Sequence, residues 1–141
     1  MTREGFSEML VTIRETTGIS KSDFARKIGW MPSDLYKIEN ATTSYNINKI
    51  ITYLSGLNLV LMLSSNCIHQ TISNSEDFAK WLKQEIEISE NSIAIIADSI
   101  CVSSKTIGRI IKHESKISID LLLKLIDYFG YTIEFQPISV L

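Results

Sequence analysis

The stretch that decides the fold is residues 24–38, FARKIGWMPSDLYKI, because it recurs as residues 96–110, IADSICVSSKTIGRI. The two copies differ in most polar positions but keep their apolar ones at a constant separation of 72 residues. The matched apolar pairs are Phe24/Ile96, Ala25/Ala97, Ile28/Ile100, Trp30/Val102, Leu35/Ile107 and Ile38/Ile110. Self-similarity at a fixed period indicates an internal repeat. The chain is therefore predicted to fold as two similar halves.

The spacing within each copy predicts two short helices joined by a tight turn. Phe24, Ala25 and Ile28 fall on one side of a helix, and Gly29 follows where a helix would end in a left-handed turn. Leu35 and Ile38, three residues apart, begin a second helical stripe. The small side chain at Ala25 allows the two helices to approach closely. This is the helix-turn-helix pattern.

With these residues, both halves resemble the Cro/Xre (phage repressor-like) family of helix-turn-helix domains. The family's usual run is an apolar residue and Ala, a Gly with an aliphatic residue, a Ser-rich start to the second helix, and a closing Ile-Glu. Ile38-Glu39 matches that ending, whereas Ile110-Ile111 departs from it. The resemblance implies a sequence-specific transcriptional regulator from a bacterium, phage or plasmid. Its third helices would enter the major groove of double-stranded DNA, about one helical turn apart.

The flanking segments complete each half. An apolar stripe predicts a first helix over residues 2–17, and Phe78, Trp81 and Leu82 repeat that stripe. A fourth helix carries Ile47, Ile50, Ile51 and Leu54. Its counterpart carries Ile119, Leu122, Leu125, Ile126 and Phe129, a shift of 75 that predicts a loop about three residues longer in the second half.

Each half then ends in a segment that predicts a β-strand, residues 57–63 and 131–135. Residues 57–63 are apolar on both faces, as in a fully covered strand. The simplest arrangement pairs the two strands within one chain around a pseudo-twofold axis, and pairing between two chains is the alternative. The predicted fold is mainly α, with lambda repressor-like domains at 1–63 and 75–141 and a polar linker at 64–74.

The third helix of the second half is the main candidate for DNA contact. Four cations and one acid, Glu114, lie between Val102 and Ser118, so this segment is basic although the net charge of the chain is −2. Lys105, Thr106 and Arg109 are predicted to read bases, because base edges present hydrogen-bond acceptors. Phosphates would be contacted by the other hydroxyls and cations of the two halves. The complete set of predicted DNA-binding residues is Ser103, Ser104, Lys105, Thr106, Arg109, Lys112, Lys21, Arg26, Ser33 and Lys37.

The first half is a weaker candidate, since Asp34 would repel phosphate. Tyr45, in the loop after its third helix, is a further potential phosphate donor. Ile93 and Ile95 stand at the front of the second half's second helix, where the family faces phosphate, and are expected to enlarge the core rather than form a protein interface.

Catalytic equipment is not recognisable in the sequence. His69 and His113 lack a shared metal spacing, and Cys67 has no neighbouring cation that would activate its thiol. Cys101 stands where the first half has its turn glycine, which predicts a less tight turn and does not indicate a nucleophile. No enzyme activity, metal or cofactor is therefore expected. Two cysteines without metal or disulfide spacing, and the absence of a signal peptide or an apolar run long enough for a membrane helix, favour a reduced cytoplasmic protein.

The alternative function is a protein-interaction module of the same fold, such as an antitoxin that binds a toxin partner. The apolar strand 57–63 is its candidate docking edge for a protein partner or a second copy, because an unpaired strand edge accepts a further strand.

Overall fold

The computed structural model describes residues 1–113 and 116–138. Within these ranges the protein is mainly α-helical, as predicted, with a small antiparallel sheet. The elements are α1 (Arg3–Thr16), α2 (Lys21–Ile28), α3 (Pro32–Glu39), α4 (Ile47–Gly56), β1 (Leu59–Ser65), β2 (Ile68–Ile72), α5 (Ser75–Ser89), α6 (Ile93–Ser99), α7 (Ser104–Ile111), α8 (Ile119–Tyr128) and β3 (Thr132–Pro137).

The repeat runs through the helices and the strand that follows them at a single separation of 72 residues. Asn46 caps α4 and Ser118 caps α8, and the left-handed residue after each helix is Asn58 or Gly130. The predicted shift of 75 for the fourth helix is therefore wrong, and the second half has no longer loop there. The error arose because α8 is apolar on several faces, so its stripe matches α4 in more than one register.

Local capping explains where the helices begin. The side chains of Ser20, Ser92 and Ser103 accept hydrogen bonds from backbone N–H groups in the first turns of α2, α6 and α7, which satisfies donors that have no partner within the helix. Met31, which precedes α3, has no such side-chain bond. Pro32 follows it at the first helical position, where the missing N–H costs nothing.

The turn between the paired helices is equally tight in both halves. Gly29 adopts φ +75° and Cys101, its equivalent, adopts φ +60°, so a non-glycine residue holds the left-handed conformation in the second half. The exit is closed by matching hydrogen bonds, from Trp30 N–H to the Ala25 carbonyl and from Val102 N–H to the Ala97 carbonyl, each 2.9 Å long. Replacement of the turn glycine by cysteine has therefore preserved the turn.

The sheet has the order β2-β1-β3, and β1 pairs antiparallel with both neighbours. The predicted pairing of the strands that end each half is confirmed, and it occurs within one chain. In this ladder Met62 lies opposite Glu134, its own equivalent in the repeat, while Leu61 lies opposite Phe135 and Leu63 opposite Ile133. The register is therefore symmetric about the Met62–Glu134 pair.

Residues 64–74 do not form the linker that their polarity suggested. They complete β1, turn at Asn66 and Cys67, and return as β2, in which Ile72 is fully buried opposite Leu61. As a result β1 is the central strand, and both of its edges are hydrogen-bonded from Leu61 to Ser64. The predicted docking edge is therefore already occupied over residues 61–63, where β2 fills the place of a partner strand. The expectation that β1 is covered on both faces holds only for one face, since Val60 and Met62 are half-exposed.

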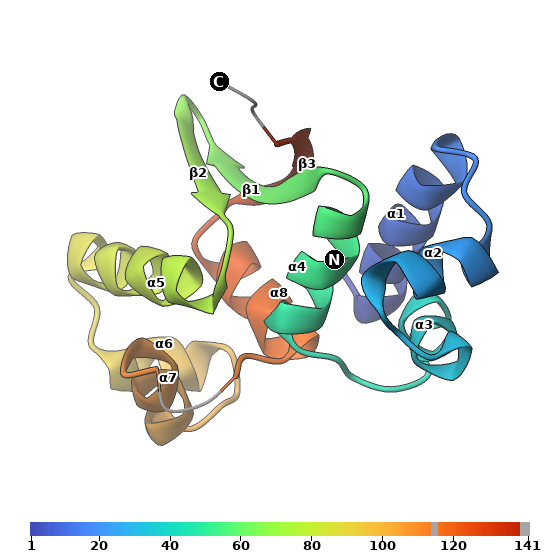
Figure 1. The fold of residues 1–141 in the computed structure, drawn as a ribbon. Helices are drawn as coiled ribbons and strands as arrows, with labels where there is room; N and C mark the ends of the chain where they lie inside the picture. Colours follow the sequence, from blue (N-terminus) through green and yellow to red (C-terminus); the bar gives the residue numbers. More distant parts are fainter. Residues whose placement is uncertain (114–115, 139–141) are drawn as a thin grey trace.

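The two halves meet around an approximate twofold axis. Ile47 N–H donates to the Ile117 carbonyl (3.0 Å), and Ile119 N–H donates to the Tyr45 carbonyl (2.7 Å), so equivalent residues exchange equivalent bonds. Asn46 and Ser118 form the bridge between these two bonds. Figure 1 shows α4 and α8 in the centre beneath the sheet, with α1–α3 on one side and α5–α7 on the other.

The hydrophobic core crosses from one half to the other. A single cluster of buried side chains includes Phe24 and Tyr53 of the first half and Trp81 and Leu122 of the second. Across the halves, the Phe6 ring meets Phe135 edge-on with the ring centroids 5.7 Å apart. The division into domains at 1–63 and 75–141 therefore remains a prediction from the repeat, since the two halves share their interior.

Candidate nucleic-acid interface

Helix α7 presents three cations along one exposed face. Lys105, Arg109 and Lys112 are spaced i, i+4 and i+7, so they share one side of the helix and its end, and all three side chains are exposed. Ile107 and Ile110 lie on the opposite side and are almost fully buried. The same short helix is thus anchored by apolar residues and charged on its outer face.

The first turn of α7 uses two of the predicted contact residues for its own structure. The Ser103 hydroxyl accepts from Thr106 N–H at 3.2 Å, and the two hydroxyls lie 2.7 Å apart in a further hydrogen bond. Ser103 therefore acts as a helix cap, and Thr106 is half-buried beside it. Ser104, next to them, is exposed and makes no side-chain hydrogen bond within the described residues.

Among the described residues, no acidic side chain forms an ion pair with this face. Within residues 1–113 and 116–138, neither Lys105 nor Arg109 forms an ion pair with an acidic side chain. Lys116, the fourth cation of the segment, is also exposed, while Glu114 lies outside the described residues. The positive charges on α7 remain available to an anionic partner.

Helix α3 presents the equivalent face with different chemistry. Ser33, Lys37 and Asn40 occupy the positions of Lys105, Arg109 and Lys112, so one cation stands where α7 and its end carry three. Asp34 is half-buried at the start of the same helix. The prediction that the first half is the weaker candidate agrees with this charge distribution.

Sequence reasoning placed Tyr36 among the outward positions of this helix without predicting a contact for it, and did not single out Met31. The structure exposes 66% of Met31, which precedes α3, and 58% of Tyr36, which lies on α3 together with exposed Ser33 and Lys37. The spacing could have indicated this, because Tyr36 follows Ser33 by three residues and precedes Asn40 by four. An apolar contact there would suit a thymine methyl group.

The predicted phosphate contacts on α2 are exposed but lie among acids. Arg26 pairs with Asp23 at 3.5 Å, and both side chains are largely exposed, so the pair holds Arg26 only weakly. Lys21 borders a hollow of about 530 Å³ that is also lined by Glu4, Glu8 and Glu15. Those glutamates would oppose the approach of a phosphate.

In the second half, the front of α6 carries isoleucines instead of charges. Ile93 is half-buried and packs against the core, as predicted. Ile95 is 54% exposed, so its predicted burial is wrong. The difference follows from helical geometry, because Ile95 precedes buried Ile96 by one residue and lies about 100° away from it around the axis.

Tyr45 cannot donate to phosphate as predicted. Its side chain is 7% exposed, and its hydroxyl hydrogen-bonds to the hydroxyl of buried Ser7 at 2.8 Å. Burial raises the pKa of Tyr45 to about 12, against a smaller opposing effect of the Ser7 hydrogen bond. Its backbone lies beside the bridge between the two halves, while its side chain is directed to Ser7 of its own half.

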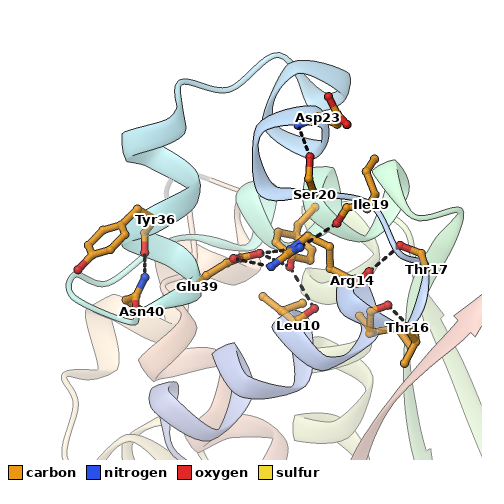
Figure 2. Close-up of polar contacts among 12 residues, drawn as sticks. Leu10, Arg14, Thr16, Thr17, Ile19, Ser20, Asp23, Tyr36, Glu39 and Asn40 are labelled. Carbon is orange, nitrogen blue, oxygen red and sulfur yellow. Dashed lines mark hydrogen bonds and ion pairs between the residues drawn. The ribbon is translucent and has the colours of Figure 1, made fainter.

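A buried polar network fixes α3 against the rest of the first half (Figure 2). The Arg14 guanidinium donates to both carboxylate oxygens of Glu39, at 2.6 and 3.1 Å, and to the Ile19 carbonyl at 2.9 Å. Tyr53 completes the network by donating to Glu39 at 2.7 Å. Burial tends to lower the pKa of Arg14, but the bonds to Glu39 outweigh it and leave the pKa above its usual value. Of this network only Glu39 was singled out from the sequence, as the end of the family motif, and its partners Arg14 and Tyr53 were not.

The second half replaces the whole network with apolar side chains. The equivalents of Arg14, Glu39 and Tyr53 are Ile86, Ile111 and Leu125, all of which belong to or pack against the core. Replacement of the whole network need not lower the stability of the second half, because a buried ion pair and well-packed apolar residues can give similar stability. The departure of Ile110-Ile111 from the Ile-Glu ending therefore coincides with the loss of an arginine partner. Comparison of the two copies at a shift of 72 would have identified the network from the sequence.

The remaining candidates for chemistry are dispersed. His69 Nδ1 bonds to the Ser64 hydroxyl at 2.9 Å on the sheet, whereas His113 follows α7. Cys67 and Cys101 are both exposed free thiols. Among the described residues there is no group of three or more His, Cys, Asp or Glu side chains placed to hold a metal ion, and no helix there is long and apolar enough to cross a membrane.

Comparison with known proteins adds no relative. No protein-family model matches the sequence, and no curated protein or solved structure matches the chain. The resemblance to the Cro/Xre family therefore rests on the motifs within residues 24–39 and 96–110. The interpretation of the surface rests on the geometry of α3 and α7.

Proposed function

We propose that this protein is a sequence-specific double-stranded DNA-binding regulator of transcription with two Cro/Xre-like helix-turn-helix units, α2–α3 and α6–α7. The observation that carries the proposal is the exposed cationic face of α7. Lys105, Arg109 and Lys112 are aligned on a helix whose other side is anchored in the core by Ile107 and Ile110. A rigid helix with a charged outer face suits insertion into the major groove.

The residues of α7 would divide the work between base reading and positioning. Arg109 has the planar donor arrangement that binds the O6 and N7 acceptors of guanine, and Lys105 can reach the same acceptors. Lys112, at the end of the helix, is placed for a phosphate, which fixes register but carries no sequence information. Ser103 and Thr106 would support these contacts indirectly by holding the first turn of the helix.

The net charge of −2 is compatible with DNA binding, but it lowers the expected affinity for unrelated duplexes. Affinity for DNA depends on the local positive surface, while the acidic remainder repels the polyanion at longer range. We therefore expect weak binding to unrelated duplexes and a marked dependence on salt.

Replacement of Arg109 by Ala should weaken binding to the preferred site by about 1–3 kcal/mol and relax the preference at one base position. Lys112→Ala should instead weaken binding to all duplexes alike and lower the salt dependence by roughly one counterion. The site would first be selected from a randomised duplex pool, and dissociation constants would then be measured at several salt concentrations.

The matched control is Lys80→Ala, which removes one exposed cation from α5, where it only forms a surface pair with Glu76. It should bind as the parent does. Parental affinity and specificity in the Arg109→Ala protein would show that α7 does not read the site.

The second candidate is a protein-interaction module of the same fold, such as an antitoxin. Strand 57–63 is already paired on both edges over residues 61–63, but Ile95 on α6 and Ile88 on α5 are 54% and 74% exposed. Exposed isoleucines favour contact with an apolar surface. A salt-insensitive complex with a protein, lost in Ile95→Lys and accompanied by no measurable DNA binding, would favour this candidate.

A further inference from the structure

The repeat places the two candidate recognition helices symmetrically. The approximate twofold axis passes through the Met62–Glu134 pair in the sheet and through the Asn46–Ser118 bridge, where residues face their own equivalents. The bridge lies at the N-termini of α4 and α8, a full helix length of about 15 Å from the sheet. Helices α3 and α7 end seven residues before Asn46 and Ser118 respectively, so each is joined to the bridge by a connection of the same length.

The connection between the two helices is rigid. The residues expected to link the halves form the β1–β2 hairpin instead, and one core cluster joins both halves. Across the halves, Asp120 of α8 accepts from the Ser44 hydroxyl at 2.9 Å and lies 3.7 Å from the Arg3 guanidinium. The separation and relative orientation of α3 and α7 are therefore fixed by packing rather than by a flexible tether.

The contacts between the two halves have the form of a symmetric dimer interface, but they occur within one chain. The β1–β3 ladder and the exchanged bonds of Ile47 and Ile119 are self-complementary, as in the interface of a symmetric dimer. The outer faces of the two helices nevertheless differ, because Ser33, Lys37 and Asn40 replace the three cations of α7. The backbones of the two halves are thus approximately symmetric, whereas the exposed side chains of α3 and α7 differ.

We propose that a single chain, without dimerising, occupies both halves of a DNA site whose half-sites are inverted, non-identical and separated by one fixed spacing. This proposal rests on the proposed function. Duplex DNA has twofold axes perpendicular to its length, so a twofold pair of reading helices meets inverted half-sites. Because α3 and α7 carry different side chains, the two half-sites must differ in sequence, unlike those of a homodimer. The α7 half-site supplies most of the salt-dependent affinity, and the α3 half-site adds polar and apolar contacts.

The experiment is selection of duplexes from a randomised pool, followed by measurement of stoichiometry on the selected site by analytical ultracentrifugation. Three double variants are selected in parallel: Lys105→Ala/Arg109→Ala on α7, Ser33→Ala/Lys37→Ala on α3, and Lys80→Ala/Lys83→Ala on α5 as the control. We expect one chain per duplex, loss of one half-site preference in each of the first two variants, and no change in the control.

Spacing provides the second measurement. Insertion of about 5 base pairs between the half-sites, half a helical turn, places them on opposite faces of the duplex. The rigid connection between α3 and α7 should then prevent simultaneous contact, and affinity should fall by about 100-fold or more. Insertion of the same length outside the site should have no effect.

The outcomes separate this inference from the proposed function. A perfect palindrome bound by two chains, or tolerance of the 5-base-pair insertion, would overturn the single-chain arrangement. A single half-site lost only in the α7 variant would overturn it too, while leaving a DNA-binding regulator. The absence of any enriched duplex would overturn the proposed function and, with it, the inference.

Discussion

Cys101 holds a backbone conformation that L-amino acids other than glycine rarely adopt, at φ +60° between α6 and α7. The left-handed region brings Cβ close to the backbone carbonyl and costs roughly 1–2 kcal/mol. Gly29 performs the same turn in the first half with nothing within 4 Å of the place that a Cβ would occupy. At Gly29, therefore, a side chain would meet the conformational cost of the left-handed region without crowding by neighbours, and Cys101 holds that same region with an exposed thiol.

We predict that Cys101→Gly stabilises the protein. The gain should be about 0.5–1 kcal/mol, because relief of the left-handed strain is partly offset by the greater freedom of glycine in the unfolded chain. The reciprocal change Gly29→Cys should destabilise it by a similar amount. Urea unfolding under reducing conditions measures both, and equal stability of parent and Cys101→Gly would show that the turn is unstrained.

Tyr45 makes stability sensitive to alkaline pH. Its pKa is raised to about 12 in the folded protein by burial, from about 10 in an unfolded chain. The neutral phenol therefore contributes stability that is fully present below about pH 10 and is lost as the pH rises toward 12. Tyr53, whose pKa is also raised by burial and by its bond to Glu39, acts in the same direction.

The free energy of unfolding should consequently fall as the pH rises above 10, and Tyr45→Phe should reduce the steepness of that fall. Urea unfolding at a series of pH values measures the slope for parent and variant. Tyr36→Phe, at an exposed tyrosine, is the control and should keep the parental slope. An unchanged slope in Tyr45→Phe would contradict the burial of Tyr45.

At the scale of elements, the two halves fix the same helices by different means. The first half ties α1, α3 and α4 together through Arg14, Glu39 and Tyr53, whereas the second packs Ile86, Ile111 and Leu125 at the equivalent positions. The polar network and the apolar packing therefore occur at equivalent positions of similar backbones in one molecule. The side chains of one half can be introduced at the equivalent positions of the other to compare their stability.

Glu39→Ile alone should destabilise the protein by about 3–5 kcal/mol, because it leaves the Arg14 charge buried without a partner. The triple variant Arg14→Ile/Glu39→Ile/Tyr53→Leu, which copies the second half, should recover most of that loss. Urea unfolding of the single and triple variants tests this. A triple variant no more stable than the single one would show that the first half cannot accommodate the apolar solution.

At the scale of the whole molecule, the shared core and the β1–β3 ladder imply that the halves unfold together. Each half contains one of the two tryptophans: Trp30 packs near Tyr53, and Trp81 packs against Phe78, with the Trp81–Phe78 ring centroids 5.2 Å apart. Trp81→Phe leaves the first half as the only source of tryptophan fluorescence, and Trp30→Phe leaves the second.

We predict that, in each single-tryptophan variant, the urea midpoint from fluorescence coincides with the midpoint from far-ultraviolet circular dichroism, as in two-state unfolding. The variants need not be equally stable, since the comparison is made within each protein. Separate midpoints for the two probes would indicate halves that unfold independently and would favour two domains.

The sequence by itself determined the repeat, the short helices joined by a tight turn and the cationic face of α7. These features depend on local periodicity: Ile107 and Ile110 must point inward, so Lys105 and Arg109 must point outward. A pairing of the strands that end each half was also expected, because each had an apolar face that needed a partner, but only the tertiary structure decided that it occurs within one chain.

Only the tertiary structure decided what lies between the halves. The polar segment 64–74 became a hairpin in which Ile72 is buried opposite Leu61, and Tyr45 is buried with its hydroxyl bonded to Ser7. Polarity predicts exposure one residue at a time, whereas burial at these positions depends on residues of other elements, 11 and 38 positions away in the sequence. The symmetric placement of α3 and α7 also depends on the tertiary structure, because it is set by contacts between the halves and not by contacts within either half.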